Sequence, residues 1–154
     1  MSLHKTTLTK LIKKNLSIST AESCTGGLLA SSITKIRNCS KIYVGGYVTY
    51  SNKLKIQDLN VKKTTIKNFG AVSRETAIEM VDGLYLKNKT NICISTTGIA
   101  GPGGGTKSKP VGLVYIGILI NGKKKVFKKN FSGSRINIQR NCVSFIFNYL
   151  NKSI

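Results

Sequence analysis

The sequence predicts an α/β fold, a three-layer α/β/α sandwich with a mixed β-sheet. Helical segments and short β-branched strands alternate along residues 4–98, which is typical of parallel βαβ units. Two further strands are joined by Asn121-Gly122, a signature of an antiparallel hairpin, so the sheet should be mixed. The chain has 154 residues, 40% of them hydrophobic, which suits a single domain over residues 1–154.

The N-terminal third contains two expected helices and two expected strands. Apolar residues recur at helical spacing over residues 4–15, which predicts an amphipathic helix. The alternating segment 16–21 predicts a short strand, and a helix over 25–36 is expected to begin at a double glycine. Residues 41–51 are rich in β-branched and aromatic side chains and predict the second strand.

The middle of the chain is mainly helical in this interpretation. Short helices are expected over residues 52–59 and 62–69. Residues 72–88 predict a longer helix, because Ser73 is a suitable N-cap and apolar residues follow it at helical spacing. The apolar segment 91–98 predicts a buried strand.

The C-terminal third begins with a loop over residues 98–110, which contains five glycines and two prolines. Residues 111–120 and 124–133 are the two expected strands of the hairpin. A final helix is expected over residues 134–151. This interleaving of helices with a mixed sheet gives the predicted three layers.

The formal net charge of +20 raises nucleic acid as a partner. However, 21 of the 25 basic residues are Lys and only four are Arg, the side chain best suited to phosphate and base recognition. The basic residues are scattered along the chain, and aromatic residues, which could stack on bases, make up only 7%. We therefore expect a solvated basic surface without a nucleic-acid partner, and a basic nucleic-acid-binding protein is the alternative function.

Cysteine and histidine usage argues against several kinds of site. The four cysteines lie far apart and form no C-x-x-C pair, so zinc and redox-dithiol sites lack their spacing. His4 is the single histidine, which leaves no Ser-His-Asp triad. We therefore expect no metal and no cofactor.

The expected location of the protein is the cytoplasm, with no membrane partner. No apolar run reaches the roughly 18 residues that a membrane-spanning helix needs. The basic, hydroxyl-rich start of the chain weakly resembles a transit peptide, but its apolar spacing favours a first helix.

The stretch AESCTGG, residues 21–27, is the first candidate site. Ser23 would stand on a turn between a strand and a helix, where the following backbone N–H groups can hold an oxyanion. Gly26 and Gly27 would let a substrate approach the backbone closely. The alternative is structural, with Ser23 or Thr25 capping the helix.

A serine nucleophile needs a base, and the stretch TYSNKLK, residues 49–55, offers one. A desolvated lysine can activate a hydroxyl group, and Tyr50 and Lys55 follow the end of a predicted strand. The ordinary lysine pKa of about 10.4 must fall to about 7–8 for that role. Spacing alone does not select Lys55 among 21 lysines, most of which should be solvated.

Two further segments are candidates for ligand binding. The glycine-rich stretch 95–112 follows a buried strand, where open α/β sheets bind ligands, and its N–H groups suit a phosphate. It matches neither the P-loop nor the dinucleotide-binding motif, and a mobile surface loop is the alternative. Arg135 and Arg140, at the start of the last helix, suit a phosphate or carboxylate, with surface salt bridges as the alternative.

Taken together and in this order, these segments resemble the CinA C-terminal domain family, which includes a stand-alone nicotinamide mononucleotide deamidase. The resemblance covers nearly the whole chain, and longer family members carry a further domain ahead of this unit. The matching segments are AESCTGG (21–27), VTYSN-x-x-K (48–55), GAVS (70–73), TGIAGPGGGT (97–106), KPVG (109–112) and G-x-R…R (133–140).

The resemblance implies an amidohydrolase that converts nicotinamide mononucleotide to nicotinate mononucleotide and ammonia, a step of pyridine nucleotide salvage. Lys55 would take the proton of Ser23, and N–H groups at the start of the 25–36 helix would hold the oxyanion. Tyr50 would orient Lys55 or protonate the departing ammonia. The implied substrate-binding residues are Thr25, Gly26, Gly27, Thr97, Gly98, Gly101, Gly103, Gly104, Arg135 and Arg140.

The chain departs from the family pattern at Ser134, where the family usually has Asp beside the arginine. Losing that carboxylate could loosen how Arg135 is held, and it motivates another alternative, a family member that binds a nucleotide without turning it over. Cys24 is a rival nucleophile, but its side chain should point away from that of Ser23 and pack as a small buried residue. The family's tendency to form homo-oligomers suggests a homo-oligomer here.

Overall fold

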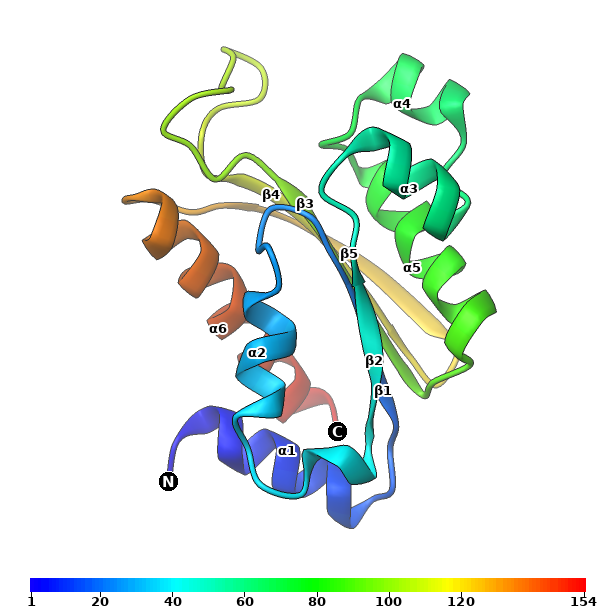
Figure 1. Cartoon of the computed structure of the whole chain (residues 1–154). Helices are drawn as coiled ribbons and strands as arrows, with labels where there is room; N and C mark the ends of the chain where they lie inside the picture. The colour runs from blue at the N-terminus through cyan, green and yellow to red at the C-terminus, as the bar shows by residue number, and fades with distance from the viewer.

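Five strands form one mixed sheet in the computed structural model, which describes residues 1–154 (Figure 1). Their order across the sheet is β2-β1-β3-β4-β5. β1 pairs in parallel with β2 and β3, whereas β4 is antiparallel to β3 and β5. The predicted α/β class with a mixed sheet is thus confirmed. The strands are β1 (Ile18–Glu22), β2 (Tyr43–Val48), β3 (Ile92–Gly98), β4 (Leu113–Ile120) and β5 (Lys123–Asn130).

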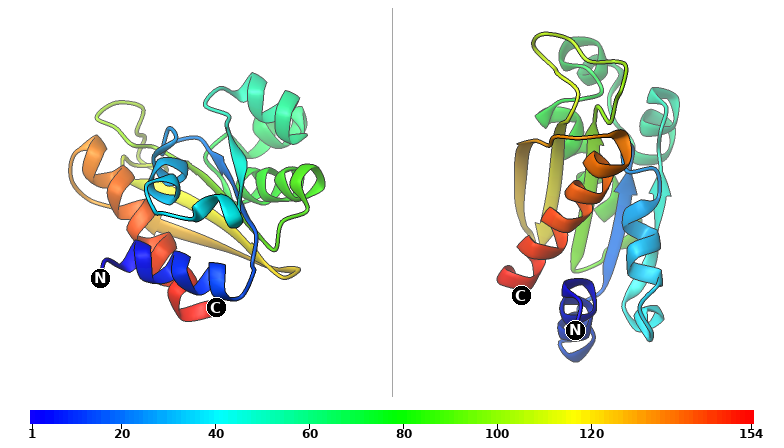
Figure 2. Two further views of the ribbon diagram at one scale, coloured as in Figure 1. Left: turned by 60° about the horizontal axis from the view of Figure 1, so that its bottom comes forward. Right: turned by 90° about the vertical axis from the view of Figure 1, so that its left-hand side faces the viewer.

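Six α-helices cover the two faces of this sheet. α1, α2 and α6 lie on one face, and α3, α4 and α5 on the other (Figures 1 and 2). A short 3-10 helix, η1 (Cys39–Lys41), which the sequence did not predict, precedes β2. The α-helices are α1 (Leu3–Lys13), α2 (Leu28–Thr34), α3 (Asn52–Leu59), α4 (Lys63–Phe69), α5 (Arg74–Asn88) and α6 (Arg135–Ser153).

Successive side chains along a strand point to opposite faces of the sheet, and this produces two separate hydrophobic cores. Ile92 and Ile94 of β3 point toward α1, α2 and α6, where they join the larger core around Phe147. Cys93, between them, points to the other face and joins the smaller core around Met80 of α5. A strand that is buried on both faces, as β3 is, explains the continuous apolar character of its sequence.

The predicted elements are present, with differences mainly at their ends. α2 begins at Leu28 rather than at residue 25, because Gly26 and Gly27 have φ angles of +57° and +98° and form a turn ahead of the helix. The hairpin turn has positive φ at both central positions, Asn121 and Gly122, as a type I′ turn requires.

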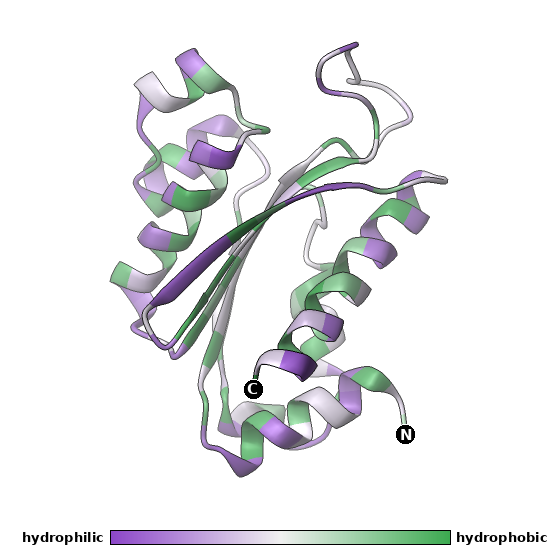
Figure 3. Ribbon diagram, turned by 180° about the vertical axis from the view of Figure 1, so that it is seen from behind, coloured by the Kyte–Doolittle hydropathy of each residue, from purple (hydrophilic) through white to green (hydrophobic).

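The β5 edge of the sheet is strongly basic. β5 carries five lysines in eight residues and is mostly hydrophilic in Figure 3. Charged side chains of this kind discourage pairing with a further strand. None of the helices has the length and apolar character that crossing a membrane would require.

α3 packs very closely against α5 on the second face of the sheet. Gly83 of α5 makes this approach possible, because a Cβ at that position would overlap the carbonyl group of Leu59. Leu59 is the last residue of α3, and both it and Gly83 are buried. The position of α3 matters for the site, since this helix carries Lys55.

Candidate active site

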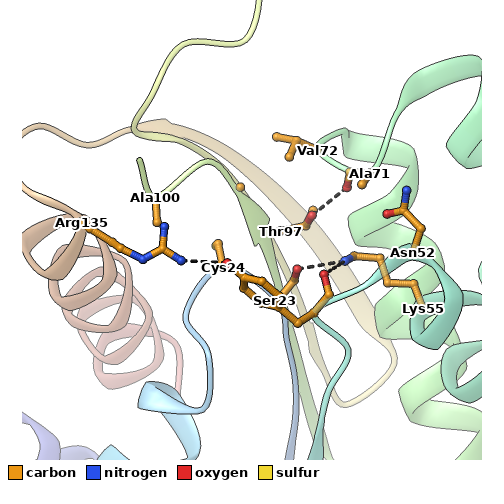
Figure 4. Close-up of a pocket in the computed structure, with 11 residues that line it drawn as sticks. Ser23, Cys24, Asn52, Lys55, Ala71, Val72, Thr97, Ala100 and Arg135 are labelled. Carbon is orange, nitrogen blue, oxygen red and sulfur yellow. Dashed lines mark hydrogen bonds between the residues drawn. The ribbon is translucent and has the colours of Figure 1, made fainter. Parts of the chain in front are cut away.

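Ser23 directly follows β1, at the edge of the sheet where the parallel strands β1, β2 and β3 end. Its backbone N–H donates to the carbonyl of Thr96 on β3 at 3.0 Å, which holds the residue against the neighbouring strand. The side chain is only 7% exposed. It points toward α3 in Figure 4, where it meets a lysine.

Lys55 projects from α3 into the same edge of the sheet, and its Nζ lies 2.9 Å from the Oγ of Ser23 (Figure 4). The same nitrogen donates to the carbonyl oxygens of Thr49 at 2.9 Å and Tyr50 at 3.3 Å. Lys55 is 1% exposed and forms no salt bridge, since the single ion pair of the protein joins Lys124 and Asp82. Burial therefore lowers the pKa of Lys55 below its ordinary value.

The three contacts of Lys55 fit both protonation states, because an ammonium can donate to Ser23 Oγ and to both carbonyls, and a neutral amine can make the same contacts with Ser23 as the donor. A neutral lysine has two N–H bonds and one lone pair, whereas the ammonium form has three N–H bonds and no acceptor. The carbonyls of Thr49 and Tyr50 can take both N–H bonds, which leaves the lone pair facing the hydroxyl of Ser23. In this state Ser23 donates to Lys55, the arrangement that a general base requires.

Glu22 organises the turn that follows Ser23, and sequence reasoning did not select it. Its buried carboxylate accepts hydrogen bonds from the hydroxyl of Thr25 at 2.6 Å and from the backbone N–H groups of Leu29 and Ala30 at 2.8 and 3.0 Å. The first N–H groups of α2 are therefore occupied. The available signal was an acidic residue three positions before a predicted helix start, where carboxylates are favourable.

Two backbone N–H groups beside Ser23 have no acceptor within the protein, those of Cys24 and Thr25. The N–H group that follows a nucleophile is a common oxyanion donor. Glu22 occupies the N–H groups of Leu29 and Ala30. Of the N–H groups expected to hold an oxyanion near the start of the 25–36 helix, those of the turn therefore remain the candidates.

A cavity of about 250 Å³ opens beside this pair of residues. Thr97 and Gly98, two of the residues expected to bind the substrate, lie at the end of β3 and line this cavity. The hydroxyl of Thr97 donates to the carbonyl of Ala71 at 2.7 Å (Figure 4). Further lining residues that were not selected from the sequence are Asn52, Ala71, Val72 and Ala100.

Arg135 reaches the cavity from the first turn of α6. Its guanidinium donates to the carbonyl of Gly101 at 2.6 Å and to the hydroxyl of Tyr50 at 2.8 Å. Tyr50 therefore contacts Lys55 through its carbonyl oxygen, and its hydroxyl is engaged with Arg135. Ser134 caps α6 by accepting from the N–H of Asn137, so Arg135 is held without the carboxylate expected at position 134.

Other predicted binding residues lie outside this cavity. Gly103 and Gly104 are exposed on the loop between β3 and β4 and do not line it. Arg140 lies about one turn further along α6 than Arg135 and lines a separate hollow between α1, α2 and α6. Gly26 and Gly27 shape the turn after Ser23 without lining the cavity.

Cys24 lines the cavity but belongs to the larger hydrophobic core. Burial raises the pKa of its thiol to about 12, so the reactive thiolate is scarce near neutral pH. No three His, Cys, Asp or Glu side chains are grouped so that they could hold a metal ion.

Comparison with known proteins identifies the family. The family model of the CinA C-terminal domain matches residues 1–154. The chain belongs to the CinA C-terminal domain family. A CinA-like protein of Kosmotoga olearia is 47% identical over 153 residues, 99% of this chain and 37% of that protein. A protein of Clostridium botulinum strain Loch Maree, named competence-damage inducible protein, is 49% identical with the same coverage. This CinA domain thus spans 37% of the length of these curated relatives.

Solved structures of CinA proteins have the same fold. The competence/damage inducible protein CihA from Agrobacterium tumefaciens superposes with a TM-score of 0.90 at 36% identity, covering 97% of this chain and 94% of that one. The competence damage-inducible protein A from Klebsiella pneumoniae gives a TM-score of 0.93 at 29% identity, covering 99% and 96%.

Proposed function

We propose that this CinA domain is an amidohydrolase that hydrolyses the carboxamide of nicotinamide mononucleotide to nicotinate mononucleotide and ammonia. One observation carries the proposal, the 2.9 Å contact between Ser23 Oγ and the Nζ of a lysine that is 1% exposed and has no acidic partner. A hydroxyl that contacts a desolvated amine is an activated nucleophile.

Acylation begins when Lys55 removes the hydroxyl proton of Ser23 and Oγ attacks the amide carbon. The electron pair of the carbonyl bond moves to its oxygen, which the free N–H groups of Cys24 and Thr25 can stabilise. When the C–N bond breaks, the protonated Lys55 returns its proton to the departing nitrogen, and ammonia leaves. The product is an ester between Ser23 and the nicotinoyl group.

Deacylation repeats the same proton transfers with water. Lys55 takes a proton from water, and the resulting hydroxide attacks the ester carbon. The C–O bond to Ser23 then breaks, Lys55 returns the proton to Oγ, and the acid product leaves. A single lysine therefore serves as base and acid in both halves of the reaction.

The choice of a pyridine mononucleotide rests on the family resemblance and on two features of the cavity. Its volume of about 250 Å³ lies just below the range of about 300–1,000 Å³ for ligand pockets, which suits a small molecule rather than a polymer. Arg135 at the cavity supplies a guanidinium that could bind the ribose phosphate.

The test is ammonia release from nicotinamide mononucleotide by the purified protein, with chromatographic identification of nicotinate mononucleotide. Ser23→Ala should abolish release, and Ser31→Ala, a serine on α2 away from the cavity, should not. Both variants should melt near the wild-type temperature.

Two outcomes would refute the proposal. Activity in the Ser23→Ala variant would show that Ser23 is not the nucleophile. A folded wild type that is stabilised by the nucleotide but releases no ammonia would instead support a binding protein without turnover.

A further inference from the structure

Most acidic residues of the protein lie on one side of the molecule. Four of the five, which are Asp58, Glu75, Glu79 and Asp82, lie on α3 and α5. The fifth, Glu22, is 1% exposed and bonded to the start of α2. The helices of the opposite face, α1, α2 and α6, contain no acidic residue.

This opposite face, the α1–α2–α6 face, carries two adjacent hollows. The first, of about 400 Å³, lies where the three helices meet and is lined by Arg140, Lys35 and His4. The second, of about 520 Å³, lies between α1 and the end of α2 and is lined by Lys5, Lys13, Lys35 and Arg37. Lys35 and Ile36 line both hollows, so the two hollows adjoin, and we refer to them together as the basic groove. The right-hand view of Figure 2 shows this face toward the viewer.

We propose that this groove binds the phosphodiester backbone of a single-stranded nucleic acid, contrary to the expectation drawn from the scattered basic residues of the sequence. Lysine and arginine side chains that neutralise phosphates release counterions, which drives binding of such a chain. With no carboxylate on these helices, the groove side chains have no acidic neighbours there to satisfy them. The binding does not depend on the proposed amidase.

The shape of the face favours a single strand over a duplex or a membrane. A flexible single-stranded nucleic acid can follow two successive hollows, as it does in other positively charged grooves. A duplex is stiff and would contact mainly the protruding parts of the surface. Membrane-surface helices need exposed apolar side chains. Most exposed large apolar residues, such as Val44, Val48, Phe69 and Leu86, lie on β2, α4 and α5. Ile136 of α6 is the one such residue on the three helices of this face, and it lines neither hollow.

The experiment measures binding of a fluorescent oligothymidine by anisotropy at several salt concentrations. The logarithm of the association constant should fall linearly with the logarithm of salt, with a slope of roughly −0.7 per neutralised phosphate. The double variant Lys35→Glu/Arg37→Glu should weaken binding about tenfold or more and flatten the slope by roughly 1.4. Both side chains are exposed, so the fold should persist.

The matched control is Lys62→Glu/Lys63→Glu, at the start of α4 on the other face. It changes the net charge by the same amount and should weaken binding less than about threefold. Equal weakening in the two double variants would show that binding follows net charge and would overturn the groove. Absence of binding at low salt, or tighter binding of duplex DNA than of the single strand, would also overturn the proposal.

Single-stranded DNA and RNA both offer such a backbone, and an RNA oligonucleotide of matched sequence shows which of them the protein prefers. Binding of either one supports the proposed role of the groove. Ser23→Ala should bind as the wild type does, whatever its amidase activity. Loss of binding in this variant would contradict a groove that is separate from the cavity.

Discussion

Arg135 donates a hydrogen bond to the hydroxyl of Tyr50 at 2.8 Å, which joins the start of α6 to the segment between β2 and α3. Since α6 and α3 cover opposite faces of the sheet, this contact spans the cavity beside Ser23. The other acceptor of Arg135, the carbonyl of Gly101, is also neutral. The positive charge of Arg135 is therefore not cancelled by a carboxylate and is available to an anionic ligand.

Replacing Arg135 by Ala should weaken binding of a phosphate-bearing substrate. A hydrogen bond to a charged group is worth about 1.5–3 kcal/mol, so KM for nicotinamide mononucleotide should rise about 10- to 100-fold. KM for the corresponding nucleoside, which lacks the phosphate, should change little. Steady-state kinetics with both substrates measures the difference. Arg74→Ala, on α5 outside the cavity, is the control, and equal KM increases for both substrates would argue against phosphate recognition.

Replacing Lys55 by Met should abolish activity without unfolding the protein. Removal of a general base costs about 10²–10⁴ in rate, so kcat should fall by at least that much. Thermal stability should stay the same or rise, because a buried amine without an ion pair is replaced by an apolar chain of similar length. Lys53→Met, an exposed lysine on the same helix, should retain wild-type kinetics. A Lys55→Met variant with substantial activity would exclude the proposed base.

The rate should increase with pH until Lys55 has lost its proton. Burial holds the pKa of Lys55 below its ordinary value, so kcat/KM should reach its plateau at a lower pH than a solvated lysine would give. A profile that stays flat through this range would contradict the role of a neutral Lys55.

The free energy of unfolding should also depend on pH through Lys55. Between the lowered folded pKa and the ordinary unfolded pKa, the unfolded chain binds one proton more, so this group makes stability rise with pH. The stability advantage of Lys55→Met over wild type should therefore be largest below the folded pKa and shrink as the pH approaches the unfolded value. Urea unfolding of both proteins at several pH values measures it, and a constant difference would contradict the lowered pKa.

Cys24 should resist alkylation, although it adjoins Ser23, the proposed nucleophile. Its thiol has a pKa of about 12 and is 5% exposed, so iodoacetamide at neutral pH should modify Cys39 first. Peptide mass spectrometry locates the modified residue. Cys24→Ala should keep most of the activity of the wild type, and rapid alkylation of Cys24 together with loss of activity would revive the thiol as nucleophile.

The sequence predicted most helices and strands correctly, because cap residues, turn residues and apolar spacing lie within the elements that they determine. Ser73 caps α5 as its position before an apolar helical pattern predicted, and Asn121-Gly122 forms the hairpin turn. α2 starts three residues later than predicted, because Gly26 and Gly27 adopt positive φ and form a turn ahead of the helix instead of its first residues. η1 is a single 3-10 turn, too short to leave a periodic signal.

The site was only partly predictable, because its residues are far apart in the sequence and come together only in the folded chain. Ser23 could be proposed from its turn, but Lys55 was one of 21 lysines until the family resemblance selected it. What distinguishes it is burial against the end of β1, a property of the packed structure. Arg135 and Arg140 looked equivalent in sequence, yet five residues along a helix rotate a side chain to a different face, and only Arg135 reaches the cavity.

The glycine at position 83 has a consequence for the contact that α3 makes with Ser23. A methyl group there would push the end of α3 away from α5, because it would overlap the backbone of Leu59. Lys55 lies one helical turn before Leu59 and would move with the helix, away from a hydroxyl that it now meets at 2.9 Å. Displacements of about 1 Å can slow a reaction about a hundredfold. The distance between Lys55 Nζ and Ser23 Oγ is therefore set in part by a residue that touches neither of them.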